Sequence, residues 1–332
     1  MNEAKETGWI LPGFLGRLSI NANQIKILAL VIMTIDHIGL YMYGLPVVAE
    51  NYLILRIIGR IAAPLFLYIV VESVRHTSNR PRLILRLYIA SLALAALRIA
   101  VTMLFGPSAG FTTFGNIFQT FLVTALVICT IDLFIKAFKA ADKTSASATS
   151  VADKTTASAA SVADKTTASS AARATDKTAS STYLLQGCAT SLLLIVPVLV
   201  LFAVTSIDFA QLGLSAAAAS NITDAVHALF PCILIVEYTP AFVLMGVIWY
   251  YAKGRIAQLI TLAVFALASG IGLFEYVPYL AGFSASIQYW MILSAPFILL
   301  YNKKKGGSMK YFFYVYYIVH PYVLIALARL LI

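Results

Sequence analysis

The sequence predicts an all-α fold, a polytopic bundle of transmembrane helices, and three observations support this class. The chain of 332 residues is 61% hydrophobic. Only 11% of its residues are charged, whereas a soluble domain would carry roughly 25%. Apolar stretches of about 20 residues, the length that crosses a bilayer, recur along nearly the whole chain.

The hydropathy pattern predicts about nine spans. They cover residues 25–45, 52–74, 83–105, 114–138, 183–205, 232–252, 256–275, 283–301 and 310–331. A tenth span is an alternative, because "SAAAASNITDAVHALF", from about Ser215 to Phe230, could be a span, an outward amphipathic helix or a re-entrant helix.

The basic residues predict the orientation of these spans. Loops rich in lysine and arginine, "RHTSNRPR", "KAFKAADK", "KGR" and "NKKKGGSMK", follow spans two, four, six and eight. The intervening loops carry the acidic residues Glu50, Asp208, Asp224 and Glu275 and no lysine or arginine. Because basic loops stay on the cytoplasmic side, we expect a cytoplasmic N-terminus.

Four regions follow from this pattern. Residues 1–24 resemble a short amphipathic segment at the membrane interface. Residues 25–138 hold spans one to four, and residues 183–332 hold spans five to nine. Between them, 139–182 contain an eleven-residue repeat of Ala, Ser, Thr, Asp and Lys. This repeat offers little apolar surface to offset chain entropy, so we expect a disordered cytoplasmic linker.

The net charge of +10 does not indicate a nucleic-acid partner, since the basic residues lie in separate loops rather than in one stripe. The three cysteines form no CxxC pair, and no metal site is expected. Walker A, GxSxG, HExxH and dinucleotide fingerprints are absent. The lipid bilayer is therefore the first partner that the sequence predicts.

Ionisable residues inside spans are the main candidates for function, because each costs about 2.5–3.5 kcal/mol to insert. Asp36 and His37 lie together in "IMTIDHIGLYM". With a rise of 1.5 Å per residue, these two residues, Arg60 and His320 all fall near the middle of a core about 30 Å thick. Asp36 and His37 should point about 100° apart, so we expect them to serve different partners.

Span two concentrates polar features in "LRIIGRIAAPLF". Arg56 and Arg60 share one helix face, where they repel each other unless an acid lies opposite. Pro64 cannot bond the carbonyl of Arg60, so the helix should kink there. Gly59 allows another helix to approach closely. An Asp36–Arg60 ion pair could be purely structural or part of a reactive centre.

The sequence resembles the TraX family, which is named for a membrane protein that N-acetylates F pilin. The resemblance rests on "MTIDHIG", "LRIIGRIAAPLFLYIVVESVRHTSNRPRLILRL" and "GNIFQTF", and more loosely on "EYTPAFVLMGVIWYY" and "KYFFYVYYIVHPYVL". In the last motif Ile318 stands where the family has a proline before the histidine, and Pro321 follows His320 instead. The resemblance implies a membrane acyltransferase in the cytoplasmic membrane of a bacterium. Its donor would be acetyl-CoA, and its acceptor a protein such as pilin or a glycan of the cell envelope.

On this hypothesis the catalytic residues are His37, Asp36 and Arg60. His37 would be the general base for an acceptor amine or hydroxyl, and Asp36 would orient or balance the site with Arg60. Either Arg56 or Arg60 would stabilise developing negative charge.

Further residues are expected to bind substrates. Arg86 and Arg82 would hold the phosphates of CoA from the cytoplasmic side, with Glu72 at the same level. Asn116 would position substrate, and His320 would line the cavity or relay protons.

Two other functions remain open from the sequence. A proton-coupled transporter or flippase of a small solute or lipid-linked sugar could use Asp36 and His37 as a relay. A structural assembly factor is the third alternative, for which the repeat is the only suggestive feature.

Overall fold

The computed structural model describes residues 19–105, 115–154, 162–252, 254–273, 287–307 and 309–331. Within these ranges the chain is helical, with no strand beyond an isolated bridge between Ile20 and Tyr301. The predicted all-α fold is therefore confirmed. Most of the predicted interfacial segment 1–24, and Glu275, lie outside the described residues.

Six helices in the described ranges are long and apolar enough to cross a membrane. They are Ala22–Tyr41, Tyr52–His76, Arg80–Phe105, Ile117–Ser145, Ala174–Thr205 and Tyr311–Leu331. Three shorter apolar helices, Thr239–Tyr251, Arg255–Gly270 and Gln288–Leu300, coincide with the other three predicted spans. The total of nine spans and the cytoplasmic N-terminus stay predictions.

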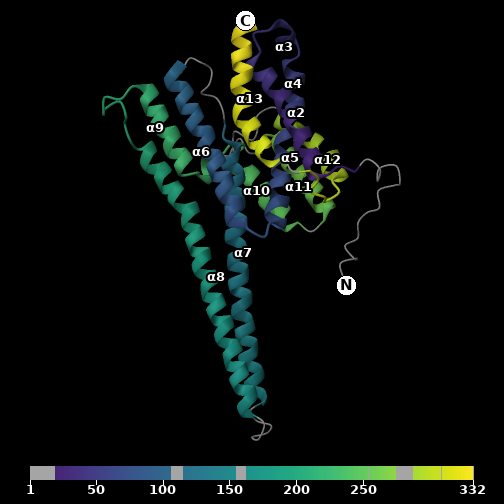
Figure 1. The fold of residues 1–332 in the computed structure, drawn as a ribbon, viewed down its shortest axis with the longest axis vertical. Coiled ribbons are helices and arrows are strands. Elements are labelled where there is room, and N and C mark those ends of the chain that lie inside the picture. The colour runs from purple at the N-terminus through teal and green to yellow at the C-terminus, as the bar shows by residue number, and fades with distance from the viewer. Residues whose placement is uncertain are drawn as a thin grey trace. The chain divides into compact units, whose positions relative to one another are not determined.

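The chain divides into two compact units, residues 1–124 with 208–332 and residues 125–207. The first unit is a helical bundle (Figure 1). Its helices are α2 (Ala22–Tyr41), α3 (Pro46–Glu50), α4 (Tyr52–Gly59), α5 (Ala62–His76), α6 (Arg80–Phe105), the start of α7 (Ile117–Lys154), α9 (Ala216–Leu229), α10 (Thr239–Tyr251), α11 (Arg255–Gly270), α12 (Ala295–Leu300) and α13 (Lys310–Leu331), with 3₁₀ turns η3 (Ile233–Ile235) and η6 (Gln288–Ser294).

Helix α2 is central to this unit, because it packs against α4, α5 and α13. Its start is set by a capping box in which the side chain of Asn21 accepts from the backbone of Gln24 and the Gln24 side chain accepts from that of Asn21. The loop before α13 is joined to the same end: Ala22 N donates to the carbonyl of Lys304 at 2.9 Å and Asn23 N to that of Lys305 at 3.2 Å. The start of α2 and this loop therefore form one fixed corner.

The predicted interruption of span two is present. Helix α4 ends at Gly59 and α5 begins at Ala62. At the break, Arg60 N and Ile61 N bond the carbonyls three residues back rather than four. The carbonyl of Arg56 thus loses its helical partner, and the Nε of Arg60 donates to it at 3.2 Å.

The segment from about Ser215 to Phe230 is helix α9, with 14 residues. At 1.5 Å per residue it is about 21 Å long, shorter than a bilayer core of about 30 Å. Helix α10, which coincides with a predicted span, has 13 residues, so length alone does not separate the two, and the choice between nine and ten spans stays a prediction.

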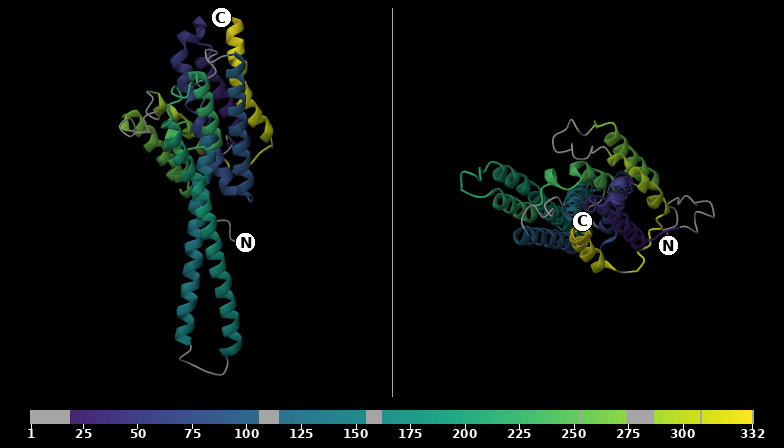
Figure 2. Two further views of the ribbon diagram at one scale, coloured as in Figure 1. Left: turned by 90° about the vertical axis from the view of Figure 1, so that its left-hand side faces the viewer. Right: turned by 90° about the horizontal axis from the view of Figure 1, so that it is seen from above.

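The second unit is an antiparallel pair of long helices, the remainder of α7 and α8 (Val162–Thr205), which lie side by side in Figures 1 and 2. Ser180 Oγ donates to the carbonyl of Ala137 at 3.0 Å, and Gly187 faces the ring of Phe134. The described residues of 139–182 are thus helical, whereas the composition of this range predicted a disordered linker. Alanine is the strongest helix former, and the repeats extend helices that apolar spans have already nucleated.

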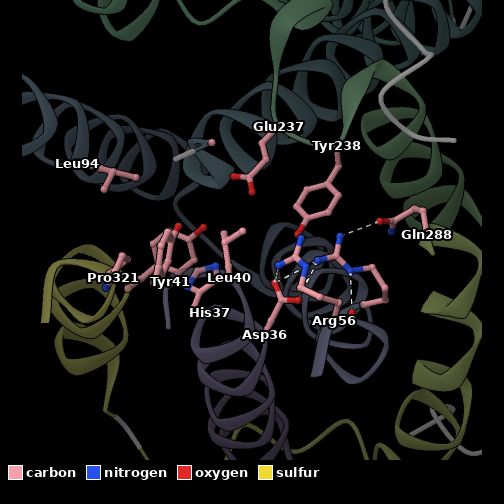
Figure 3. A pocket seen from close by; sticks show the side chains of 13 residues that line it. Asp36, His37, Leu40, Tyr41, Arg56, Leu94, Glu237, Tyr238, Gln288 and Pro321 are labelled. Atoms are coloured by element: carbon pink, nitrogen blue, oxygen red, sulfur yellow. Dashed lines mark hydrogen bonds and ion pairs between the residues drawn. The ribbon is translucent and has the colours of Figure 1, made fainter. Parts of the chain in front are cut away.

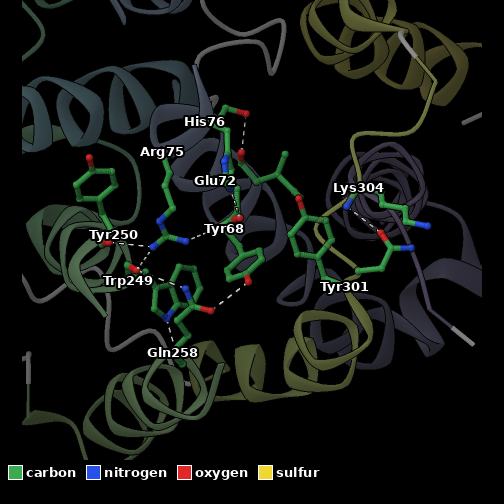
Figure 4. Close-up of polar contacts among 12 residues, drawn as sticks. Tyr68, Glu72, Arg75, His76, Trp249, Tyr250, Gln258, Tyr301 and Lys304 are labelled. Atoms are coloured by element: carbon green, nitrogen blue, oxygen red, sulfur yellow. Dashed lines mark hydrogen bonds and ion pairs between the residues drawn. The ribbon is translucent and has the colours of Figure 1, made fainter. Parts of the chain in front are cut away.

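A buried polar network joins α5, α10 and α11 (Figure 4). Arg75 donates to the carbonyls of Trp249 at 2.8 Å and Tyr250 at 2.9 Å, which lie in the last turn of α10. Gln258 accepts from the Tyr68 hydroxyl at 3.1 Å, and its carbonyl accepts from Trp249 Nε1 at 2.8 Å. Arg75 therefore acts as a cap supplied by another helix.

Replacing this cap should destabilise the bundle. We expect Arg75→Ala to lower the free energy of unfolding by about 1.5–3 kcal/mol, because two carbonyls lose a charged donor and the buried Glu72 loses its ion-pair partner. Unfolding by SDS titration in mixed micelles measures the change. The matched control is Arg82→Ala, which removes an exposed arginine and should change stability by less than about 0.5 kcal/mol. Equal losses in the two variants would contradict the capping role.

Candidate functional site

The first unit encloses a cavity of about 250 Å³ that we call the polar cavity (Figure 3). Helices α2, α4, α6 and α13 contribute to its wall, together with the segments just before α7 and α10 and the start of η6. Among its wall residues are Asp36, His37, Arg56 and Arg60, four of the residues predicted to act. Side chains far apart in the sequence therefore meet at one place.

Asp36 is held between two arginines. Arg60 Nη2 donates to both of its carboxylate oxygens, at 3.0 and 3.1 Å, and Arg56 Nη1 lies 2.8 Å from Oδ2. Asp36 is 6% exposed and Arg60 8%. The predicted Asp36–Arg60 pair is thus present, and Arg56 completes a cluster with one net positive charge.

Local backbone features bring this cluster together. A Cβ at Gly59 would overlap the carboxyl group of Asp36, so glycine is required for α4 to approach α2. The same break that ends α4 lets Arg60 bond the free carbonyl of Arg56. Arg60 Nη1 also donates to Oε1 of Gln288 in η6 at 3.3 Å. The arginine is therefore fixed from three sides.

His37 and His320 form a hydrogen-bonded pair between α2 and α13. The Nδ1 of His37 lies 2.6 Å from the Nε2 of His320, and the two rings are within 3° of parallel. The Nδ1 of His320 lies 2.9 Å from the carbonyl of Tyr316, which can only accept, so that nitrogen carries a proton. With both rings neutral, His320 Nε2 accepts from His37 Nδ1–H, and His37 Nε2 keeps a lone pair.

Tyr316 fixes the orientation of this pair. Its ring is stacked on that of His320, with centroids 5.2 Å apart. Its hydroxyl is 2.7 Å from Thr34 Oγ1, which itself donates to the carbonyl of Leu30 at 2.8 Å. The tyrosine hydroxyl is therefore the donor to Thr34, and the contact ties α13 to α2 three residues before His37.

Several residues of the polar cavity had no role predicted from the sequence, among them Glu237, Tyr238 and Gln288. Glu237 and Tyr238 project toward the cavity in Figure 3. Among the described residues, Glu237 Oε2 is buried without a hydrogen-bond partner, and the missing side chain of Gly115 leaves room for this carboxyl group. The signal available in the sequence was an acid at the edge of an apolar stretch, in "EYTPAF".

The other predicted residues lie elsewhere. Arg86 and Glu72 line a second cavity of about 440 Å³, and Glu72 pairs with Arg75 and with His76 (Figure 4). Arg82 is exposed and lines neither cavity.

Asn116 lies just before α7 and lines neither cavity, and its proposed role in positioning substrate stays a prediction. Its Nδ2 donates to the carbonyl of Ser91 at 3.1 Å and to the hydroxyl of Ser91 at 3.0 Å. The amide nitrogen therefore ties the start of α7 to α6, while Asn116 Oδ1 is buried with no hydrogen-bond partner among the described residues.

The fold and site together define a helical protein of the membrane type with a buried charge cluster and His37 at one cavity. His320 bonds His37 but does not itself line either cavity. A family model described as TraX protein matches residues 21–211, more than half of the chain. The chain therefore belongs to the TraX family. The matched range includes Asp36, His37, Arg56 and Arg60, whereas His320 lies beyond it. Comparisons with curated proteins and with solved structures gave no match.

Removing Asp36 should lower the free energy of unfolding more than removing one of its two arginine partners. We expect Asp36→Ala to destabilise the protein by about 3–5 kcal/mol, because two buried guanidinium groups lose their counter-charge. Arg56→Met should cost less, since Asp36 keeps its two bonds from Arg60. Unfolding in mixed micelles again measures both. A loss for Arg56→Met as large as that for Asp36→Ala would contradict the central role of the carboxylate.

Proposed function

We propose that this chain is an integral membrane acyltransferase that moves an acetyl group from cytoplasmic acetyl-CoA to an amine or hydroxyl of an acceptor at the cell envelope, such as a pilin or a glycan. Membership of the TraX family supports this proposal. The observation that carries it is the histidine pair, which leaves His37 Nε2 with a lone pair at the wall of a polar cavity.

In the proposed reaction His37 is the general base. Its Nε2 takes the proton from the acceptor as the acceptor nitrogen or oxygen forms a bond to the thioester carbonyl carbon. When the carbon–sulfur bond breaks, the same nitrogen returns the proton to the departing thiolate. The acetyl group moves from sulfur to the acceptor, one proton moves from the acceptor to the thiolate, and His37 is neutral at the start and at the end.

His320 has a positioning role in this scheme. Its Nδ1–H is committed to the carbonyl of Tyr316, so its Nε2 must accept from His37. This bond fixes the tautomer and the ring plane of His37, and it strengthens when His37 carries the extra proton. The arrangement matches the logic of a base that is oriented by a third group.

The arginine–aspartate cluster supplies the electrostatic part. Its net positive charge lies at the wall of the same cavity, where it would stabilise the oxyanion that forms when the carbonyl is attacked. The cluster is already ordered by its internal bonds, so little reorganisation is needed during the reaction.

The proposal is tested with purified protein and labelled acetyl-CoA. We expect His37→Ala to lower the rate of acetyl transfer by about 10²–10⁴-fold, because the acceptor keeps its proton. The matched control is His227→Ala, a histidine of α9 outside both cavities, which should keep the wild-type rate.

A folded His37→Ala protein with full transfer would overturn the role of His37. Proton-coupled uptake of a solute or lipid-linked sugar by the wild-type chain, without any acetylated product, would instead favour the transporter.

A further inference from the structure

The second cavity, which we call the basic cavity, is distinguished by its charge. It is walled by Lys26 of α2, Arg86 of α6, and Lys303 and Lys305 of the loop before α13. Its one acid, Glu72, is already bound to Arg75. Arg86 Nε is buried with no hydrogen-bond partner among the described residues. A volume of about 440 Å³ lies within the range of small-molecule sites.

The lysine loop is held rigidly at this cavity. Its carbonyls at Lys304 and Lys305 accept from the first N–H groups of α2. Lys303 has a φ of 60° and Gly306 a φ of 71°, so the chain turns sharply on both sides of this contact. Lys303 and Lys305 line the cavity and Lys304 does not, so the anchored backbone presents two cationic side chains at the cavity wall.

An apolar space, the aromatic passage, adjoins the basic cavity. It has a volume of about 110 Å³ and is walled largely by Phe66, Phe118, Phe121, Phe313 and Tyr314 with aliphatic neighbours. It shares Lys26 and Phe313 with the basic cavity. It shares Phe66 and Tyr317 with a small space beside Asp36 and His37, which in turn borders the polar cavity.

Helix α2 shows the order of these spaces directly. Asn23 and Lys26 face the basic cavity, Lys26 and Leu30 the passage, and His37 the small space and the polar cavity. Lys26 and His37 are eleven residues apart, roughly 16 Å along the helix. Helix α13 repeats the order, from Phe313 at the basic cavity to Tyr317 at the polar cavity.

We propose that the basic cavity binds the phosphorylated head of an elongated cosubstrate, with Lys303 and Lys305 as its principal ligands, and that the aromatic passage holds the cosubstrate's uncharged arm. Several cations at one wall match a head with several phosphates. The aromatic passage matches a thin arm directed toward His37, and the space of about 20 Å³ beside Asp36 and His37 would have to widen to admit the end of that arm. If the proposed acyltransferase function holds, this cosubstrate is the CoA thioester.

The experiment measures binding to the purified full chain in phosphatidylcholine nanodiscs by calorimetry, with CoA and with adenosine 3′,5′-bisphosphate as probes. The double variant Lys303→Ala/Lys305→Ala should raise the Kd for both probes about 100-fold, about tenfold for each charged contact. Binding should also weaken as salt is added. The matched control Lys304→Ala removes the same charge from the same loop outside the cavity, and should bind as the wild type does.

A second variant tests the passage separately. Val70→Phe adds bulk to its wall, so it should weaken CoA binding and leave adenosine 3′,5′-bisphosphate binding unchanged. The Lys303→Gln/Lys305→Gln protein repeats the lysine test if the alanine variant does not fold. Nanodiscs with phosphatidylglycerol test the other source of phosphate: an anionic lipid held by these lysines, with no CoA binding, would overturn the proposal.

The outcomes separate this inference from the catalytic proposal. His37→Ala should bind CoA as tightly as the wild type does. Loss of CoA binding in the lysine variant, together with full acetyl transfer by His37→Ala, would support the proposed binding site and contradict the role of His37 as general base. Unchanged CoA binding in the lysine variant, or no CoA binding by the wild-type chain, would overturn the site.

Discussion

The bond between Asp36 and two arginines is the constraint on which the rest of the first unit depends. Burying a carboxylate and two guanidinium groups costs desolvation free energy, which their ion pairs and hydrogen bonds to one another offset. That contact requires α4 to reach α2 closely, which Gly59 permits. It also requires span two to break after Gly59, so that Arg60 can turn back to the carbonyl of Arg56. Gln288 then draws η6 to the same point.

The histidine pair is organised by a different principle. The contacts of His37 and His320 do not pair opposite charges. They determine which ring nitrogen carries the proton. The carbonyl of Tyr316 determines which nitrogen of His320 is protonated, and His320 in turn determines the tautomer of His37. Because the two histidines come from α2 and α13, the contact between these helices sets both the orientation of His37 and the row of spaces between them.

Much of this organisation could be predicted from the sequence. Hydropathy predicted the all-α class, and the cost of burying charge singled out Asp36, His37, Arg60 and His320, which the structure brings together. Three features could not be predicted from the sequence, and the binding roles expected for Asn116 and Arg82 stay predictions. Asn116 binds Ser91 rather than a cavity, Arg82 is exposed on the surface, and the repeats are largely helical because alanine-rich sequence extends helices that are already formed.

By itself the sequence determined which residues need an explanation, since a charge in an apolar run is costly wherever the helices pack. Only the tertiary structure decided which of them touch. Glu237, Tyr238 and Gln288 reach the polar cavity from segments that follow the long α7–α8 pair in the chain, and Lys303 and Lys305 face the basic cavity while Lys304 does not. Such contacts depend on helix rotation and on loop backbone angles, which are set by packing between distant segments and leave no periodic trace in the sequence.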